Sequence, residues 1–219
     1  MDRRRMMMAA QTPPTPSIQP YFRLAFTNGL TPEIAPAGTT ISKVGTVSVI
    51  TGEAIASQGE LQISPNPFVA GEKSYRFKYK QTTLHNYTRL YMDCNRNSPY
   101  GNGFYISVGS VSGYQYVDQI VNNAGNFVAT LPTQVANTVY DLVFTTTGDT
   151  TPNGCKLYVN GVLTDTQTAP AASSSASGAY GYLMDATNNS TTRFDGSVYL
   201  MEIYDRVLTA DEVLELYNS

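Results

Sequence analysis

The chain has 219 residues, of which 42% are hydrophobic and 14% are charged, with 17 Gly and 12 Pro. This length and composition favour one large all-β domain over two small domains. The formal net charge of −3 provides no general attraction for nucleic acid or an anionic membrane, so we expect neither as a partner.

The first twenty residues form a segment of their own. They contain a run of arginines and a run of methionines before the proline-rich stretch QTPPTPSIQP: Arg3, Arg4, Arg5, Met6, Met7 and Met8. Because proline fixes φ and favours an extended path, we interpret residues 1–20 as an extended basic, proline-rich arm and residues 21–219 as the sandwich domain. The apolar part of the start is too short for a signal peptide, and no later run reaches membrane-spanning length. We therefore expect synthesis as a soluble cytosolic protein.

After the arm, short apolar or alternating runs are separated by Gly, Asn, Pro and Ser, which is typical of strands joined by turns. The predicted strands are 21–27, 46–51, 59–63, 75–81, 88–94, 103–108, 114–120, 126–130, 138–145, 155–159, 162–167, 179–184 and 197–204. This many short strands at regular spacing predict a two-sheet sandwich or jelly roll.

Two local patterns are informative within these runs. Aromatic and cationic residues alternate along residues 75–80, so we expect one buried face and one wet face in that strand. Asn160 and Gly161 lie between two apolar runs, and both tolerate the positive φ of a two-residue hairpin turn. The sequence therefore predicts a hairpin at residues 160–161.

The strand at 197–204 is apolar on both faces. Val198 and Leu200 point one way, whereas Tyr199, Met201 and Ile203 point the other, which predicts an inner strand with both faces covered. We expect the second sheet to cover one face, and the following helix and the end of the arm to cover the other.

A capping box begins that helix, with Thr209 followed three residues later by Glu212. The apolar residues that follow predict a helix face that folds back over the sheet: Val213, Leu214, Leu216 and Tyr217.

Two stretches near the end, KLYVNGVLTDTQ and FDGSVYLMEIYDRVLTADEVLELYN, resemble the concanavalin A-like, laminin-G-type jelly roll. YFRLAFTNGLTPE is similar to the first strand and turn of that family, so the resemblance covers residues 21–218. It implies an all-β, two-sheet jelly-roll sandwich with a short C-terminal helix, preceded here by the N-terminal arm. The inner strand of the family usually carries an acidic pair where this chain has Tyr199 and Leu200, so we expect the corresponding face to be apolar and covered.

The fold hosts lectins, glucanases, adhesion modules and structural proteins, so function depends on particular residues. Glycosidases of this fold resemble one another in a Glu-x-Asp-x-x-Glu run that places two carboxylates on one face, and this chain has no such run. Asp211, Glu212 and Glu215 belong to the predicted helix. His85 has no acid within a few residues, and we interpret it as a solvated loop residue. We therefore expect no catalytic residues and no enzyme activity.

We expect no cofactor, with Ca²⁺ at the rim of the sandwich as the less favoured alternative. Candidate oxygen ligands are Asp93 with Asn95, Asp149 with Asn153, Asp185 with Asn188, and Asp195. None has the spacing of a dedicated loop, so we interpret them as Asx turns and strand caps. Cys94 and Cys155 lack a metal-binding or redox motif, and we interpret them as packing residues.

A glycan site would need aromatic faces that stack on sugar rings. The stretch SPYGNGFYISVGSVSGYQY places four candidate tyrosines around a Gly- and Ser-rich hairpin: Tyr100, Tyr105, Tyr114 and Tyr116. The alternative is that these tyrosines are half-buried packing residues.

The arm suggests a different role. An extended arm that is ordered needs a surface to lie on, which points to a protein assembly with acidic or apolar docking sites for Arg3–Arg5 and Met6–Met8. The start MDRRRMMMAA also resembles the Arg- and Met-rich starts of virion proteins from tailed phages of gut bacteria, including crAss-like phages.

Three hypotheses follow. The first is a non-catalytic virion structural protein, a capsid-decorating or tail-associated jelly roll that the arm anchors to other virion proteins and that resides in the virion. The second is a lectin-like adhesion module that binds host polysaccharide through the hairpin tyrosines. The third, which the missing acid pair disfavours, is a diverged glycoside hydrolase.

Overall fold

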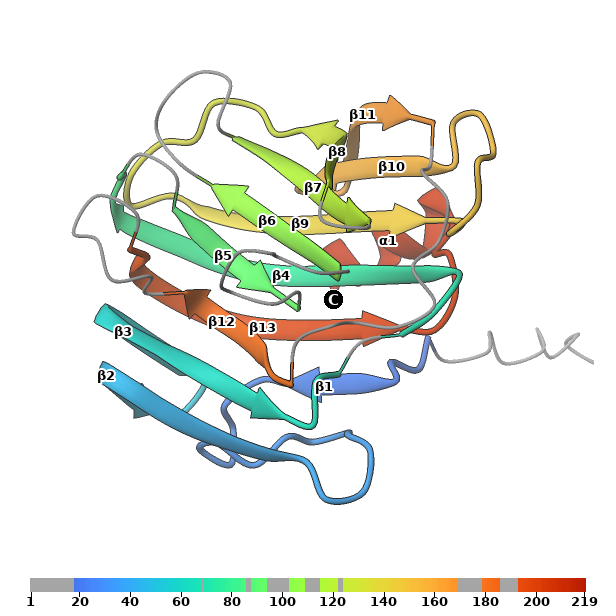
Figure 1. Cartoon of the computed structure of the whole chain (residues 1–219). Helices are drawn as coiled ribbons and strands as arrows, with labels where there is room; N and C mark the ends of the chain where they lie inside the picture. Colours follow the sequence, from blue (N-terminus) through green and yellow to red (C-terminus); the bar gives the residue numbers. More distant parts are fainter. Residues whose placement is uncertain are drawn as a thin grey trace, which may run out of the picture.

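The computed structural model describes residues 18–67, 69–85, 88–93, 103–108, 115–121, 124–168, 179–185 and 193–219. These residues form thirteen strands and a C-terminal helix (Figure 1). The elements are β1 (Phe22–Leu24), β2 (Thr40–Ile50), β3 (Glu53–Ser64), β4 (Lys73–Thr83), β5 (Arg89–Met92), β6 (Gly103–Val108), β7 (Gln115–Val121), β8 (Ala124–Thr130), β9 (Val139–Thr146), β10 (Cys155–Val159), β11 (Val162–Gln167), β12 (Gly181–Asp185), β13 (Asp195–Tyr204) and α1 (Ala210–Asn218).

The strands form one antiparallel sheet that curls into two packed layers (Figure 1). Its order is β11-β10-β9-β4-β13-β3-β12-β5-β6-β7-β8, with β1 beside β13 and β2 beside β3. Phe104 of β6 packs against Tyr75 of β4 and Phe144 of β9, with ring centroids 5.9 and 5.7 Å apart. The layers therefore enclose a common aromatic core, and the predicted all-β jelly roll with a short C-terminal helix is confirmed.

Most predicted strands are present, but β2 and β3 are much longer than predicted. Gly45 and Gly59 interrupt the apolar pattern, yet they lie opposite one another inside the β2–β3 hairpin. A β-carbon on Gly45 would lie 2.4 Å from the Gln58 carbonyl oxygen. These glycines therefore permit a close backbone approach at a bulge rather than ending a strand.

The predicted hairpin at residues 160–161 is confirmed. Asn160 and Gly161 have φ angles of 51° and 76° and join Val159 to its partner Val162. Two successive positive φ angles are those of the turn type that matches the twist of a hairpin.

Strand β13 is covered on both faces, as predicted, but its side chains do not alternate strictly. The register shifts between Val198 and Leu200. This bulge places Val198, Met201 and Ile203 together in the inner core, whereas Tyr204 packs outward with Val213 of α1. The predicted opposition of Val198 to Met201 is therefore wrong, because an extra residue in a strand reverses the side-chain order beyond it.

Helix α1 packs on the outer face of the sheet. Its capping box is present: the Thr209 hydroxyl accepts a hydrogen bond from the Glu212 amide, and the Glu212 carboxylate accepts one from the Thr209 amide. Val213 is buried, but Leu214 and Tyr217 are 48% and 44% exposed. The buried face of the helix is thus narrower than predicted.

The end of the arm that the structure describes also lies on this outer face. Ile18 packs against the cluster formed by Tyr158, Tyr204 and Val213, and Pro20 is buried. The predicted cover over the outer face is therefore present, whereas the division of the chain at residues 20 and 21 stays a prediction. In the part of the chain that is described, no helix is long and apolar enough to cross a membrane.

Candidate functional site

A buried ion network lies between α1 and the sheet. Arg76 was predicted to lie on a wet face, but it is 5% exposed and pairs with Asp141 at 2.7 Å and Glu202 at 3.1 Å. Its Nη2 also donates to the Leu216 carbonyl at 2.6 Å, and Arg23 pairs with the other oxygen of Glu202. Burial lowers the pKa of Arg76, but its bonds to both carboxylates outweigh this effect and raise the pKa above its ordinary value. The network therefore fastens the last turn of α1 to β4.

Beside this network is a pocket of about 450 Å³, which we call the α1 pocket. Strands β4 and β9, the hairpin between β10 and β11, and the end of α1 contribute its lining: Lys78, Val139, Asp141, Asn160, Tyr217 and Asn218. Lys78 and Asp141 are cross-strand partners, so their side chains emerge on the same face of the sheet.

The aromatic wall of the α1 pocket is held by the hairpin. A β-carbon on Gly161 would lie 3.0 Å from the Cδ1 atom of Tyr217, so the ring rests directly on the glycine. Two observations explain the glycine at residue 161. Its φ is +76°, which other residues rarely adopt, and the Tyr217 ring occupies the space that a side chain would need. Tyr217 remains 44% exposed, which leaves ring surface available for stacking on a ligand.

Two acceptors of the α1 pocket are engaged and two donor groups are free, whereas Asn218, which also lines the pocket, carries both a donor and an acceptor. Arg76 occupies both oxygens of the Asp141 carboxylate, and Asn160 Oδ1 accepts a hydrogen bond from the Asp141 amide at 2.9 Å. Within the described part of the chain, the Lys78 ammonium and the Asn160 side-chain nitrogen have no hydrogen-bond partner. The pocket therefore offers an aromatic surface flanked by two hydrogen-bond donors, which suits an oxygen-rich ligand.

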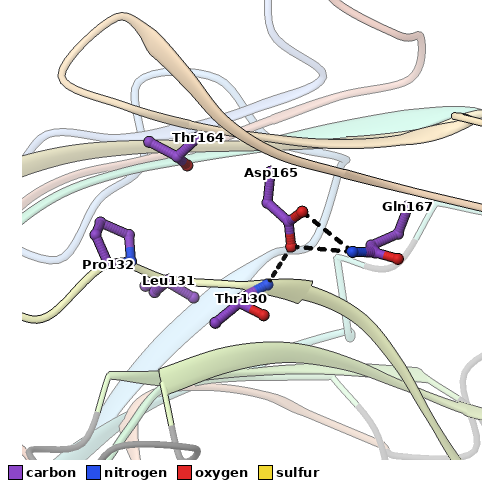
Figure 2. A pocket seen from close by; sticks show the side chains of 6 residues that line it. All are labelled: Thr130, Leu131, Pro132, Thr164, Asp165 and Gln167. Carbon is purple, nitrogen blue, oxygen red and sulfur yellow. Dashed lines mark hydrogen bonds between the residues drawn. The ribbon is translucent and has the colours of Figure 1, made fainter.

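A second pocket, of about 320 Å³, lies where the two ends of the curled sheet meet; we call it the seam pocket (Figure 2). Figure 2 shows Asp165 of β11 between Thr130 and Gln167. The Asp165 carboxylate accepts from the Thr130 amide at 2.7 Å and from Gln167 Nε2 at 3.1 Å, and the Thr164 hydroxyl donates to the Leu157 carbonyl. Among the described residues, no aromatic ring lines the seam pocket. Through these hydrogen bonds Asp165 connects β8 to β11, and we therefore do not interpret it as a ligand-binding group.

His85 lies in the loop after β4, as predicted, but the prediction that its side chain is solvated is wrong. Its Nε2 lies 2.7 Å from Asp195 Oδ2, and the side chain is 18% exposed. Arg193 Nε donates to the same oxygen at 3.0 Å. The acid that contacts His85 is Asp195, at the start of β13. It is distant in the sequence and reaches His85 only because β13 pairs with β4 in the sheet. Asp195 is therefore a junction between β13 and the segment after β4, not a simple turn acid.

The candidate calcium ligands have other partners where the structure describes them. Asp93 is fully buried and accepts hydrogen bonds from the Tyr75 hydroxyl and the Phe104 amide. Asp149 accepts from the Thr147 hydroxyl and the Thr151 amide, as in an Asx turn. Asn95, Asn188 and the side chain of Asp185 lie outside the described residues. Within the described ranges, no group of three or more His, Cys, Asp or Glu side chains could hold a metal ion.

None of the predicted glycan-binding tyrosines that the structure describes lines the α1 pocket. Tyr105 is half-buried in β6, with the Arg89 guanidinium 5.3 Å from its ring centroid. Tyr100, Tyr114 and the side chain of Tyr116 lie outside the described residues, as do the arm residues Arg3, Arg4, Arg5, Met6, Met7 and Met8. Their roles stay predictions.

The cysteines were predicted to be packing residues. Cys155 is buried, and burial raises the pKa of its thiol to about 11, which suits a packing role. Cys94 lies outside the described residues.

The residues of the α1 pocket carried only partial signals in the sequence. Tyr217 fits the apolar face of a helix, Asn160 fits a hairpin turn, and Lys78 fits the solvent-exposed face of a strand. Glu202 was the clearest unused signal, because a single acid in an otherwise apolar strand needs a buried partner.

The family model described as "Concanavalin A-like lectin/glucanases superfamily" matches residues 56–214. A search of curated proteins finds no match. Among solved structures, the chain is similar to domain 4 of AbnA, a GH43 extracellular arabinanase from Geobacillus stearothermophilus, in complex with arabinotriose. The TM-score is 0.70 and the identity 16%, over 91% of this chain and 98% of that chain.

The chain is also similar to two botulinum neurotoxin binding domains. For the receptor-binding domain of the mosaic serotype C/D, the TM-score is 0.65 and the identity 15%; for the binding domain of serotype G, the values are 0.65 and 17%. Each match covers 91% of this chain but only 50% of the other chain, so the present chain spans about half the length of these binding domains. At these identities, the similarities show the fold.

Proposed function

The chain belongs to the concanavalin A-like lectin/glucanase superfamily, and from that premise we propose that it is a non-catalytic, lectin-like module that binds carbohydrate in the α1 pocket. The observation that carries this proposal is the exposed Tyr217 ring, which rests on Gly161 beside the free donors of Lys78 and Asn160. Sugars present apolar C–H faces that stack on aromatic rings and hydroxyl oxygens that accept hydrogen bonds.

The state of the nearby acids supports a binding role without catalysis. A glycosidase needs one carboxylic acid that donates a proton and a second carboxylate that is free to act on the sugar or on water. Asp141 and Glu202 are both paired with Arg76, and both are buried under α1. They are therefore occupied in holding the helix, and we propose no catalytic residue and no cofactor.

The solved structures add support for a carbohydrate ligand. The structure of domain 4 of the arabinanase is that of a complex with arabinotriose, and this chain matches 98% of the length of that domain. Only 16% of residues are identical, so we use arabinotriose as a first probe and do not assign it as the ligand of this chain.

Isothermal titration calorimetry, guided by an array of oligosaccharides that includes arabinotriose, tests this proposal. The wild-type protein should bind at least one oligosaccharide, and Tyr217→Ala should weaken that binding at least tenfold. Tyr180→Ala is the matched control, because Tyr180 is also exposed, at 39%, but precedes β12 and does not line the α1 pocket. The proposal is wrong if no oligosaccharide on the array binds, or if Tyr217→Ala and Tyr180→Ala lose the same amount of affinity.

A second candidate function is that of a virion structural protein, a capsid-decorating or tail-associated jelly roll from a tailed phage. Ile18 packs against the outer face of the sheet with Tyr204 and Val213, so the arm joins the domain beside α1. We propose that Arg3–Arg5 and Met6–Met8 bind acidic and apolar sites on neighbouring virion proteins. The two functions are compatible, because a decorating protein can also bind host polysaccharide.

Deletion of residues 2–17 tests the second candidate, because it leaves the contact of Ile18 intact. The shortened protein should fold and keep any glycan binding but fail to join its parent particle in a reconstitution assay. Unchanged incorporation would contradict anchoring by the arm.

A further inference from the structure

We infer that the α1 pocket selects acidic saccharides, with a sugar carboxylate paired to Lys78. This inference rests on the proposed function and names the class of sugar that the same site takes. Lys78 is exposed on β4, lines the pocket together with Tyr217, and has no ion-pair partner in the described part of the chain. A ligand that stacks on the Tyr217 ring would therefore meet an unneutralised cation at the pocket wall.

The free hydrogen-bonding groups of the pocket are mainly donors. Lys78 has three N–H donors and no acceptor, and Asn160 retains its two N–H donors because its oxygen already accepts from the Asp141 amide. The one carboxylate in the lining, Asp141, is bound by Arg76 through Nε and Nη2. A neutral sugar hydroxyl can accept from these donors, but a carboxylate offers two charged oxygens and makes stronger hydrogen bonds with them.

Among the described side chains, those of the pocket lining and of the network beneath it carry one more positive charge than negative charges. Beneath it, Arg23 and Arg76 are balanced by Asp141 and Glu202 within one network. Lys78 is therefore the unbalanced charge of the lining. The C-terminal end of α1 contributes roughly half an elementary negative charge, which weakens the field of a full ammonium group without cancelling it.

The acids of α1 do not neutralise Lys78 either. Glu212 is paired with Arg206 at 2.6 Å. Asp211 and Glu215 lie six and two residues before Tyr217, which at 3.6 residues per turn places them about 120° or more around the helix from the ring. The ring and the ammonium group therefore act on a ligand together, without a competing acid from the helix.

Two matched pairs of saccharides test this inference by calorimetry: 3′-sialyllactose with its methyl ester, and trigalacturonate with its methyl ester. Each pair compares a carboxylated sugar with a counterpart that lacks the charge. At low salt, at least one acid should bind about five- to tenfold more tightly than its counterpart, as expected for an ion pair in a partly enclosed pocket. This preference should shrink when salt is raised to 0.3 M.

The charge of Lys78 is tested directly by Lys78→Met, which retains most of the aliphatic chain. In this variant, loss of the Lys78 hydrogen bond should weaken the binding of both saccharides, and loss of the ion pair should weaken the acid further, so that the acid and its neutral counterpart bind with equal affinity. Lys43→Met, at an exposed lysine on β2, should leave the preference intact.

Equal or weaker binding of both acids, or a preference that survives in Lys78→Met, would overturn the inference. In that event, any neutral oligosaccharide whose binding depends on Tyr217 would still support the proposed function. If neither pair nor the wider array binds, the inference and the proposed function fail together.

Discussion

The Arg76 guanidinium binds the Asp141 carboxylate through two nitrogens, with Nε 3.0 Å from Oδ1 and Nη2 2.7 Å from Oδ2. The same guanidinium reaches Glu202 on the next strand and the Leu216 carbonyl of α1. One side chain thus joins β4, β9, β13 and the helix, and it places the helix that carries Tyr217.

Removal of this guanidinium should be strongly destabilising. Arg76→Met would leave two buried carboxylates without their main partner, so we expect the free energy of unfolding to fall by about 3–5 kcal/mol. Urea denaturation at pH 7 measures this change. Lys78→Met, two residues along the same strand at an exposed position, should change the free energy of unfolding by less than about 0.5 kcal/mol. A small effect of Arg76→Met would show that the network does not hold the outer face.

Alanine substitutions at two glycines with positive φ distinguish the effect of backbone strain from the effect of displacing the Tyr217 ring. Gly161→Ala and Gly52→Ala both force alanine into a left-handed conformation, at φ angles of 76° and 80°, and each should cost about 1–2 kcal/mol of stability. Only at residue 161 would the new β-carbon meet the Tyr217 ring, because nothing lies within 4 Å of a β-carbon at residue 52. We therefore expect glycan binding to weaken in Gly161→Ala alone. Equal binding by both variants would contradict the role of the ring.

The buried lysine at residue 73 should make stability rise with pH. Burial lowers the pKa of Lys73 to about 8, although nearby Asp93 opposes the change. Between pH 8 and about 10.5 the unfolded chain keeps a proton that the native protein has released, so the free energy of unfolding increases with pH in this range.

The comparison with Lys73→Met isolates this effect. Between pH 7.5 and 9.5, wild type should gain about 1–2 kcal/mol relative to the variant. The raised pKa of the Cys155 thiol acts in the opposite direction above pH 9, but it is common to both proteins and cancels in the difference. Parallel stability curves for the two proteins would contradict a lowered pKa at Lys73.

The contact between β8 and β11 should become less stable when the Asp165 carboxylate is removed. In Asp165→Ala the Thr130 amide loses its acceptor, and we expect its hydrogen exchange to become at least tenfold faster. The amides that join β9 to β10 should keep their protection, because they belong to the regular ladder. Unchanged exchange at Thr130 would show that the seam is closed by other contacts.

Much of the fold could be predicted because its signals are local. Alternation identified most strands, the Asn160-Gly161 pair identified a hairpin, and Thr209 with Glu212 identified the start of the helix. The bulge in β13 and the close approach at Gly45 could not be predicted, because each depends on the backbone of a partner strand.

The candidate site was much less predictable than the fold. Lys78, Asn160 and Tyr217 come from three elements, and each has an ordinary local explanation as a surface lysine, a turn residue or a helix residue. They become a site only when the Arg76 network docks α1 beside the hairpin. His85 and Asp195 meet in the same way, through the pairing of β4 with β13.

Chemical-shift mapping by NMR is the most direct test of the central claim, which is that the sandwich binds carbohydrate in the α1 pocket. The oligosaccharide that binds most tightly on the array is titrated into labelled wild-type protein. The account predicts that the largest amide shifts occur at Asn160, Gly161 and Tyr217. Shifts that instead cluster around Tyr105 in β6, or that are absent at saturating sugar, would contradict it.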